Sequence, residues 1–485
     1  MSTPMRAVLV VVVLLAIAVL VVWRSLTPVP PLALPESGAI LSGVTLVNPG
    51  LDRRNEVEIR VVGSRIHTIA SASVGEGGPY AGAYVLPGLV DMHVHFPPDS
   101  PLRQAELFAF LFLYHGVTTV RDAGDVDGTA TGPAREGVES GAFPGPRIFA
   151  CGPFIDGEDP LWPNSEIIRG PGDARRAVEA LAEGGFDCVK VYGRLSASGL
   201  EAVRGEAQKH GLPLIGHVPF SVSYEKARLD DVQHMTRMPV SPIDDERGFP
   251  ALMVDWRNLD EERTEFLVQT TLEFGIANTP TLIVTEQFAA MADYETLRAS
   301  PDAQLLPRLY RDVVWSPVEG LPSLRTLGEE DFAALRDARA PRMALVERLH
   351  RAGARIHVGS DVQNPFVIPG ASLHRELALL VEAGLTPEDA WQAATRVSGG
   401  FLAPGLGRIA EGAPADLLVF REDPTRDLAA LDTLEAVIAQ GRLYTREALD
   451  AQLARYRAQF ENPIYDAVSV FVARRLMARI VDGDR

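Results

Sequence analysis

The sequence predicts an α/β protein whose main domain is a (β/α)8 TIM barrel, and two observations support this prediction. Between residues 85 and 403, short apolar runs rich in β-branched residues alternate with helical stretches, and eight such runs can be counted. Histidine, lysine and aspartate residues stand at the carboxyl ends of these runs, where barrels of this kind carry their chemistry. The predicted strands span residues 85–96, 116–124, 146–154, 187–193, 213–219, 230–235, 276–284 and 355–362.

Helix-start signals separate the predicted strands. Pro101 follows Ser100 at the start of a helical stretch that should end at Gly116, and Pro387 follows Thr386 at the start of another. Proline suits the first helical position because its missing N–H would have no partner there. These signals support helices between the strands.

Both ends of the chain have a different pattern. Residues 38–84 contain alternating runs such as "GAILSGVTLV" and "EVEIRVV", and strand character returns in residues 404–445 with "PADLLVF" and "EAVIAQGRLY". We therefore expect one small β-unit built from both ends, flanking the barrel of residues 85–403. Residues 446–485 are expected to form a helical extension, whose last stretch "IYDAVSVFVARRLMARIV" is amphipathic. It could pack on the barrel, on a partner subunit or on a membrane surface.

The N-terminus predicts a signal anchor. Residues 7–23 carry no charge and lie between Arg6 and Arg24, and no A-x-A-like cleavage site follows them. We interpret residues 1–24 as a single transmembrane helix and residues 25–37 as a Pro-rich linker. The prediction is a membrane-anchored protein with its globular part on the outer or periplasmic side.

Charge and cysteine content limit the function classes. The formal net charge of −18 argues against a nucleic-acid groove. The two cysteines, Cys151 and Cys188, are far apart in the sequence, so we expect neither a disulfide framework nor a thiolate zinc site. Both oxidising and reducing compartments stay open, as does assembly into a homo-oligomer.

Six potential ligands stand at the ends of five predicted strands. In the first strand, alternation places Asp91, His93 and His95 on one face, so both imidazoles can reach one ion. A lysine that points into a barrel must lose its proton or find an anion, and reaction with carbon dioxide would turn it into a bridging carbamate. Nitrogen and oxygen donors favour Zn²⁺, with Mn²⁺ or Co²⁺ as substitutes. The six are His93, His95, Lys190, His217, His234 and Asp361.

The motifs resemble those of the amidohydrolase superfamily, in particular its imidazolonepropionase-like and prolidase-like branch. They include "VLPGLVDMHVH", "GVTTVRDAG", "VKVYG", "GHVP", "QHM", "GSD", "AGLTPEDAWQAAT" and "LGRIAEGAPADLLVF". The resemblance implies that the β-unit is a β-sandwich. It also implies that His93 and His95 bind one ion and that His217 and His234 bind a second.

The resemblance further implies that carboxylated Lys190 bridges the two ions and that Asp361 is both a ligand and the proton shuttle. The expected reaction is hydrolysis of a carbon–nitrogen bond in a small-molecule amide, cyclic amide or dipeptide by a metal-bridging hydroxide. Tyr192 and Tyr224 are candidate substrate-binding residues. Where peptide-cleaving relatives have a Gly-Gly-His stretch, this chain reads "CGPFIDGEDPLWP", so we expect a different pocket wall.

Two alternatives belong to other functional classes. A mononuclear deaminase would need a glutamate three residues after His217, and Phe220 stands there. A non-catalytic scaffold would be expected to have lost ligands, whereas all six positions are filled. A count of bound metal ions distinguishes the three functions: two ions indicate the hydrolase, one the deaminase and none the scaffold.

Overall fold

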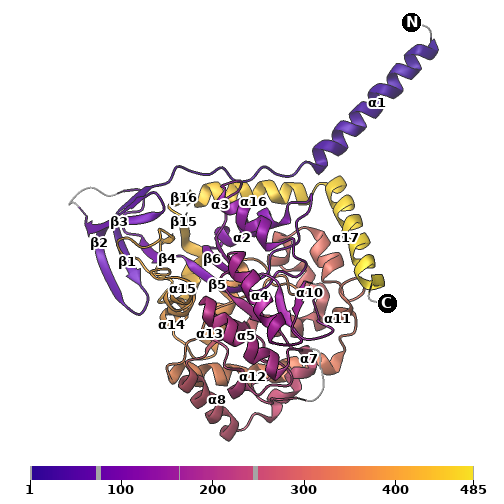
Figure 1. Cartoon of the computed structure of the whole chain (residues 1–485). Helices are drawn as coiled ribbons and strands as arrows, with labels where there is room; N and C mark the ends of the chain where they lie inside the picture. The colour runs from indigo at the N-terminus through magenta and orange to yellow at the C-terminus, as the bar shows by residue number, and fades with distance from the viewer. Residues whose placement is uncertain (1–2, 73–77, 163, 244–248, 484–485) are drawn as a thin grey trace.

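Short parallel strands surround the centre of the computed structural model, and helices cover them on the outside (Figure 1). The structure describes residues 3–72, 78–162, 164–243 and 249–483, apart from some side chains near both chain ends and at position 251. The barrel-side strands are β5 (Leu89–Val94), β6 (Val117–Asp122), β7 (Arg147–Ala150), β8 (Phe154–Asp156), β9 (Ser165–Ile167), β10 (Val189–Val191), β11 (Leu214–Gly216), β12 (Asp231–Gln233) and β13 (Ala277–Thr279).

These strands form two sheets. One has the order β5-β6-β7 and the other the order β13-β12-β11-β10-β8-β9. The predicted eighth strand, residues 355–362, is reduced to isolated bridges that pair Ile356 with Asn278 and Val362 with Val94. These bridges connect β13 to β5 and close the barrel on that side. The prediction of a barrel beside a sheet domain is confirmed.

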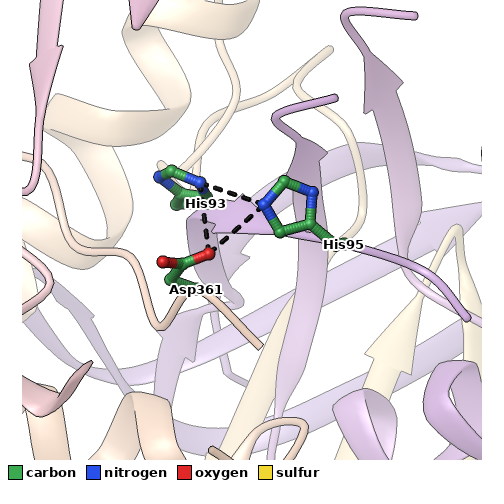
Figure 2. Close-up of side chains that lie close together, drawn as sticks. All are labelled: His93, His95 and Asp361. Carbon is green, nitrogen blue, oxygen red and sulfur yellow. Dashed lines mark hydrogen bonds and ion pairs between the residues drawn. The ribbon is translucent and has the colours of Figure 1, made fainter. Parts of the chain in front are cut away.

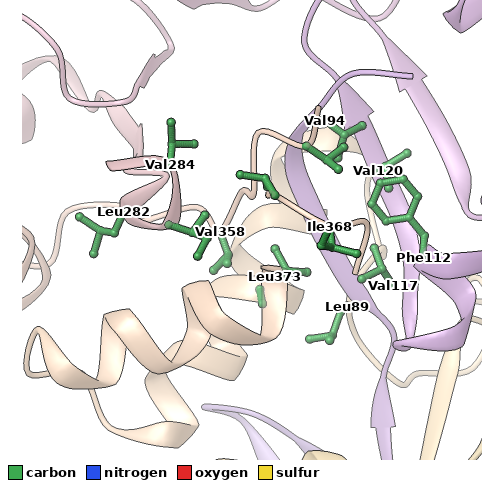
Figure 3. Packing of buried hydrophobic residues seen from close by; sticks show 14 of the residues in the cluster. Leu89, Val94, Phe112, Val117, Val120, Leu282, Val284, Val358, Ile368 and Leu373 are labelled. Carbon is green, nitrogen blue, oxygen red and sulfur yellow. The ribbon is translucent and has the colours of Figure 1, made fainter. Parts of the chain in front are cut away.

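The helices pack their apolar side chains against the barrel wall. Every residue of β5 and β6 is buried, as expected for parallel strands covered on both faces. Figure 3 shows Phe112 beside Val117 and Val120, within one large apolar cluster. The longer helices are α2 (Gln104–Tyr114), α3 (Thr131–Glu139), α4 (Pro171–Glu183), α5 (Ala197–His210), α8 (Glu261–Phe274), α9 (Leu282–Ala290), α12 (Glu329–Arg351) and α13 (Ala371–Glu382). Shorter ones are α6 (Tyr224–Ala227), α7 (Phe249–Leu252), α10 (Tyr294–Ala299), α11 (Pro322–Arg325), α14 (Pro387–Gln392) and α15 (Ser398–Leu402).

The prediction of one strand over residues 276–284 is wrong in its second half. Strand β13 ends at Thr279, and α9 begins at Leu282. Pro280 cannot donate to the ladder, so the strand stops there. The buried carboxylate of Glu376 then accepts hydrogen bonds from the N–H groups of Leu282 and Ile283, at 2.9 and 2.7 Å, and so satisfies the first turn of α9.

Both chain ends contribute to the second domain, as predicted, but its strands form a single sheet rather than two. The order is β16-β15-β14-β4-β1-β2-β3, and β4 pairs in parallel with β1 and antiparallel with β14. Apolar side chains from both ends share one buried cluster. The strands are β1 (Ala39–Asn48), β2 (Asp52–Val62), β3 (Arg65–Ser71), β4 (Tyr84–Pro87), β14 (Leu417–Phe420), β15 (Leu434–Ala439) and β16 (Arg442–Thr445).

The N-terminal segment forms one helix, α1 (Thr3–Leu26), which projects away from the rest of the molecule (Figure 1). Across the residues that the structure describes, no helix was found that is both long and apolar enough to cross a membrane. The predicted transmembrane anchor is therefore unsupported. Within the predicted span, the side chains of residues 7, 8, 10, 11 and 18 lie outside the described set.

The predicted linker lies on the C-terminal extension. Gln459 of α16 (Arg446–Phe460) donates a hydrogen bond to the carbonyl of Thr27, and Gln452 donates one to that of Pro30. The second C-terminal helix, α17 (Pro463–Gly483), begins directly after Asn462, whose side chain accepts from the first backbone N–H groups. Residues 27–37 are thus held against the protein instead of forming a free spacer.

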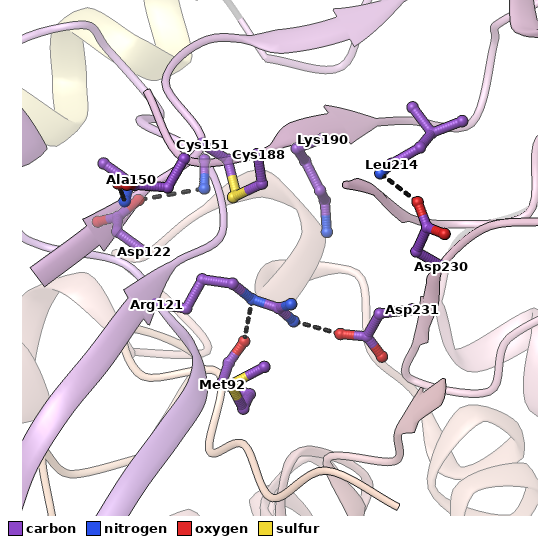
Figure 4. The surroundings of a disulfide bond; sticks show 12 residues. Met92, Arg121, Asp122, Ala150, Cys151, Cys188, Lys190, Leu214, Asp230 and Asp231 are labelled. Carbon is purple, nitrogen blue, oxygen red and sulfur yellow. Dashed lines mark hydrogen bonds and ion pairs between the residues drawn. A yellow bond between two sulfur atoms is a disulfide. The ribbon is translucent and has the colours of Figure 1, made fainter. Parts of the chain in front are cut away.

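The two cysteines are joined, so the expectation that they would make no disulfide framework is corrected. Cys151 and Cys188 form a disulfide with their Cα atoms 4.5 Å apart (Figure 4). Cys151 directly follows β7, and Cys188 directly precedes β10. A separation of 37 residues is spanned because the barrel brings these two positions side by side.

Candidate metal centre

Three of the predicted ligands meet at the mouth of the barrel (Figure 2). The Nε2 atoms of His93 and His95 are 3.3 Å apart, and the Oδ1 atom of Asp361 lies 3.3 Å from the first and 3.2 Å from the second. His93 is on β5, and His95 is the first residue after its end. Asp361 is held by a backbone hydrogen bond, since its N–H donates to the carbonyl of His93 at 2.6 Å.

The other two histidines lie beside this group. The ring of His234 is 4.6 Å from that of His93 and 4.8 Å from that of His217, measured between centroids. The Nδ1 atom of His234 is 3.6 Å from the Oδ2 atom of Asp361 and 2.7 Å from the hydroxyl of Thr281. The structure therefore brings His217 and His234 to the same mouth as the first three.

Lys190 points into the barrel from β10, and only 1% of its surface is exposed. Its Nζ donates to the side-chain carbonyl of Gln233, a neighbour that the sequence analysis missed. Burial, helped by the positive charge of Arg121, lowers the pKa of Lys190 to about 7 even though Asp361 acts in the opposite direction. A large part of the amine population is therefore neutral near pH 7, and a neutral amine can react with carbon dioxide.

Burial also keeps most of the imidazoles neutral. It lowers the pKa of His93 and His217 well below the usual value, with Lys190 adding to the effect, and lowers that of His234 to about 3. The pKa of His95 is raised, because the adjacent Asp361 carboxylate outweighs burial. Burial alone would raise the pKa of Asp361, but the imidazoles of His234 and His95 hold it below the usual value.

This donor set fits a divalent cation. Neutral imidazoles and a carboxylate are the forms in which these side chains bind metals. Neighbouring ligands about 2.0 Å from a tetrahedral Zn²⁺ are about 3.3 Å apart, which is the separation found among His93, His95 and Asp361. The Nδ1 atom of His95 also lies 2.7 Å from the carbonyl oxygen of Gly124, a contact that leaves Nε2 directed at the group.

Aromatic side chains form a wall beside the histidines. Between ring centroids, Tyr192 is 4.2 Å from His217. The ring centroid of Phe154 is 5.3 Å from that of Tyr192 and 6.3 Å from that of His95. Trp162 stacks on Phe154 at 6.1 Å. Phe154 and Trp162 belong to the "CGPFIDGEDPLWP" segment, for which the sequence predicted a pocket-wall role. Tyr192, a predicted substrate-binding residue, is half-buried in this wall.

Tyr224 does not lie at this site, so its predicted role in substrate binding is not supported. It begins α6, is fully buried, and has its hydroxyl 2.7 Å from that of Thr271 in α8. Since the Thr271 hydroxyl donates to the carbonyl of Leu267, Tyr224 is the donor of this bond. The ring packs in the large apolar cluster, and its one polar atom is satisfied away from the mouth.

We expect Tyr224→Phe to leave KM unchanged and to lower the free energy of unfolding by about 1 kcal/mol, the net value of one buried hydrogen bond. Steady-state kinetics and denaturant unfolding would measure the two quantities. Tyr192→Phe serves as the matched variant, because it removes the same atom from a ring beside His217. A rise in KM for Tyr224→Phe would show that Tyr224 does bind the substrate.

A buried arginine supports the His234 side of the centre. Arg342, on α12, is 1% exposed and donates to the carbonyl oxygens of His234 and Pro280, both at 2.9 Å. It thereby holds the segment that carries Thr281, whose hydroxyl contacts the His234 ring. Nothing in the sequence around Arg342 indicates this contact, because α12 is about a hundred residues further along the chain than His234.

The barrel and the donors at its mouth are those of a metal-dependent hydrolase. The chain belongs to the amidohydrolase family, whose sequence model matches residues 84–251 and 262–444. Its fold is similar to that of a Xaa-Pro dipeptidase, with 20% identity, a TM-score of 0.60 and coverage of 84% of this chain and 100% of the other. Bottromycin amidohydrolase gives 23% identity, a TM-score of 0.66 and coverage of 87% and 91%.

A curated relative comes from Mycobacterium tuberculosis. It is an uncharacterized protein, 24% identical over 412 residues, which are 81% of this chain and 94% of that protein. Membership of the amidohydrolase family supports a metal-dependent hydrolase that acts on carbon–nitrogen bonds.

Proposed function

We propose that this protein is a binuclear metal amidohydrolase that cleaves the carbon–nitrogen bond of a small amide, a cyclic amide or a dipeptide. One observation carries the proposal: four imidazoles, a lysine amine and a carboxylate, from five segments of the barrel wall, come together at one mouth. The contacts that join them are those among His93, His95, His234, His217 and Asp361, with Lys190 buried beside Tyr192.

Each residue has a proposed role toward the metal. His93 and His95 would hold one ion, and His217 and His234 the other. Lys190, once carboxylated, would bridge both, and Asp361 would complete the set. Zn²⁺ suits these nitrogen and oxygen donors, with Mn²⁺ or Co²⁺ as substitutes. When bound, the two ions would supply the Lewis acidity that activates water near neutral pH.

Proton transfer is assigned to Asp361. Because the neighbouring imidazoles hold its pKa low, it is a carboxylate at neutral pH and can accept the proton of the attacking water. It would then give that proton to the leaving nitrogen. Burial raises the pKa of Tyr192 to about 12, so its hydroxyl stays protonated and can donate to the oxyanion that develops on the substrate.

We also propose that the globular part lies on the outer or periplasmic side. The supporting feature is the Cys151–Cys188 disulfide, since structural disulfides persist in oxidising compartments. Recovery of the active protein from its native cells with both thiols free would contradict this location.

The function is tested by a metal count together with a substrate panel. We expect two ions per chain in protein loaded with Zn²⁺ and measurable turnover of at least one class among dipeptides, N-acyl amino acids and lactams. Release of the amine product identifies cleavage of the carbon–nitrogen bond. One ion with ammonia released from an aminated ring would identify a deaminase instead, and no bound ion would identify a scaffold.

A further inference from the structure

The candidate metal ligands are divided between two sheets. His93 lies on β5 and His95 just after it, so both belong to the three-stranded sheet. Lys190 on β10, His217 after β11 and His234 after β12 belong to the six-stranded sheet. A centre that uses both sets depends on how firmly the two sheets are held to each other.

The sheets meet along two seams. At the first seam, residues 356–362 bridge β13 and β5. The N–H of Met92 donates a hydrogen bond there to the carbonyl of Val358 at 2.8 Å. The second seam lies between the end of β7 and the start of β10. There the N–H of Asp187 donates to the carbonyl of Ala150 at 2.7 Å, and the Asp187 carboxylate accepts from the N–H of Ala150 at 2.8 Å.

The disulfide crosses this second seam as a covalent link. Cys188 is two residues before Lys190, so both side chains point to the same face of the strand, into the barrel. Figure 4 shows Lys190 following Cys188 on that strand, beside the disulfide. Both cysteines are buried, with Ile215 in the same small cluster and Phe401 packed against it. The disulfide therefore lies inside the barrel, and its Cys188 stands two residues before Lys190, the proposed bridging residue.

We infer that the Cys151–Cys188 disulfide is a positioning element of the metal centre. It fixes the strand that carries Lys190 against the sheet that carries His93 and His95. The inference rests on the proposed binuclear function, in which Lys190 must reach ions held from both sides. Without the link, each sheet keeps its own hydrogen-bond ladder, so the loss should fall on the ligand that spans them rather than on either histidine pair.

The test compares Zn²⁺ binding in the oxidised wild type with that in Cys151→Ala/Cys188→Ala, by competition with a chromophoric chelator. We expect two binding steps in the wild type. In the variant the weaker step should lose about 10-fold to 100-fold in affinity, the usual cost of removing support from a metal ligand, while the tighter step changes far less. Ile215→Val is the matched control, because it trims the same cluster and leaves the link intact.

If the alanine pair fails to fold, Cys151→Val/Cys188→Ala fills more of the vacated space and takes its place. Unchanged affinity in both steps, or a loss confined to thermal stability, would overturn the inference. So would two free thiols in the fully loaded wild type. A wild type that binds only one ion contradicts the binuclear function itself, and this is visible before any variant is compared.

Discussion

Lys190→Ala should lose nearly all turnover and one of the two bound metal ions. Lys190 is buried beside the histidines, and its carbamate would supply the negative charge that neutral imidazoles and the single Asp361 carboxylate cannot. Metal analysis of purified protein and steady-state kinetics measure the two losses. A small carboxylate added to the medium should restore part of the activity, because it can occupy the space that the side chain leaves.

Lys190→Met is the matched control. It removes the amine but keeps most of the volume, so added carboxylate should not rescue it. In the wild type, apo protein should regain activity faster with added carbon dioxide. At a fixed carbon dioxide pressure the rate should rise as the pH passes through about 7, because the ammonium form that dominates below this pKa cannot react. Reconstitution independent of carbon dioxide, or electron density that ends at Nζ in the active enzyme, would contradict the carbamate.

Asp361→Asn should lower kcat by about 10²-fold to 10⁴-fold, the contribution typical of a positioned general acid or base. The amide keeps an oxygen for the ion, so metal content should fall less than turnover does. The imidazoles of His95 and His234 stabilise the negative charge of the Asp361 carboxylate. The amide of the variant has no such charge for them to stabilise.

Asp125→Asn is the matched control for Asp361→Asn. The Asp125 carboxylate is also buried, but it accepts hydrogen bonds from the N–H groups of Gly128, Ala130 and Thr131 rather than facing the histidines. The substitution Asp125→Asn should reduce stability while leaving kcat close to that of the wild type. Near-normal turnover in Asp361→Asn would show that another group moves the proton.

The positions of the ligands could be predicted because barrel topology places strand ends at one mouth. His93 and His95 follow from simple alternation. His234 does not, because Asp231 and Gln233 take the inward positions of β12, and alternation would turn His234 outward. Its backbone φ of 60° brings the ring back toward the centre, a conformation that the sequence does not reveal. The correct prediction for His234 thus depended on the strand-end rule and not on the strand period.

Other features depend on packing between distant segments. The side of α6 that faces the core is set by α8, so Tyr224 could not be placed from its own neighbours. The disulfide depends on the relative stagger of β7 and β10, and the support from Arg342 depends on where α12 crosses the barrel. By contrast, the end of β13 had a visible signal, since Pro280 lies inside the run that was predicted as one strand.

The pairing of β4 with β14 has a consequence for the newly made chain. Strand β4 leads through Gly88 directly into β5, which carries His93, yet its partner β14 is synthesised about 330 residues later. At a synthesis rate of about 5–20 residues per second that interval is on the order of tens of seconds, during which one edge of β4 has no strand beside it. An open edge can pair with other chains. A strand made long after β4 therefore protects the strand that leads to the first metal ligands made.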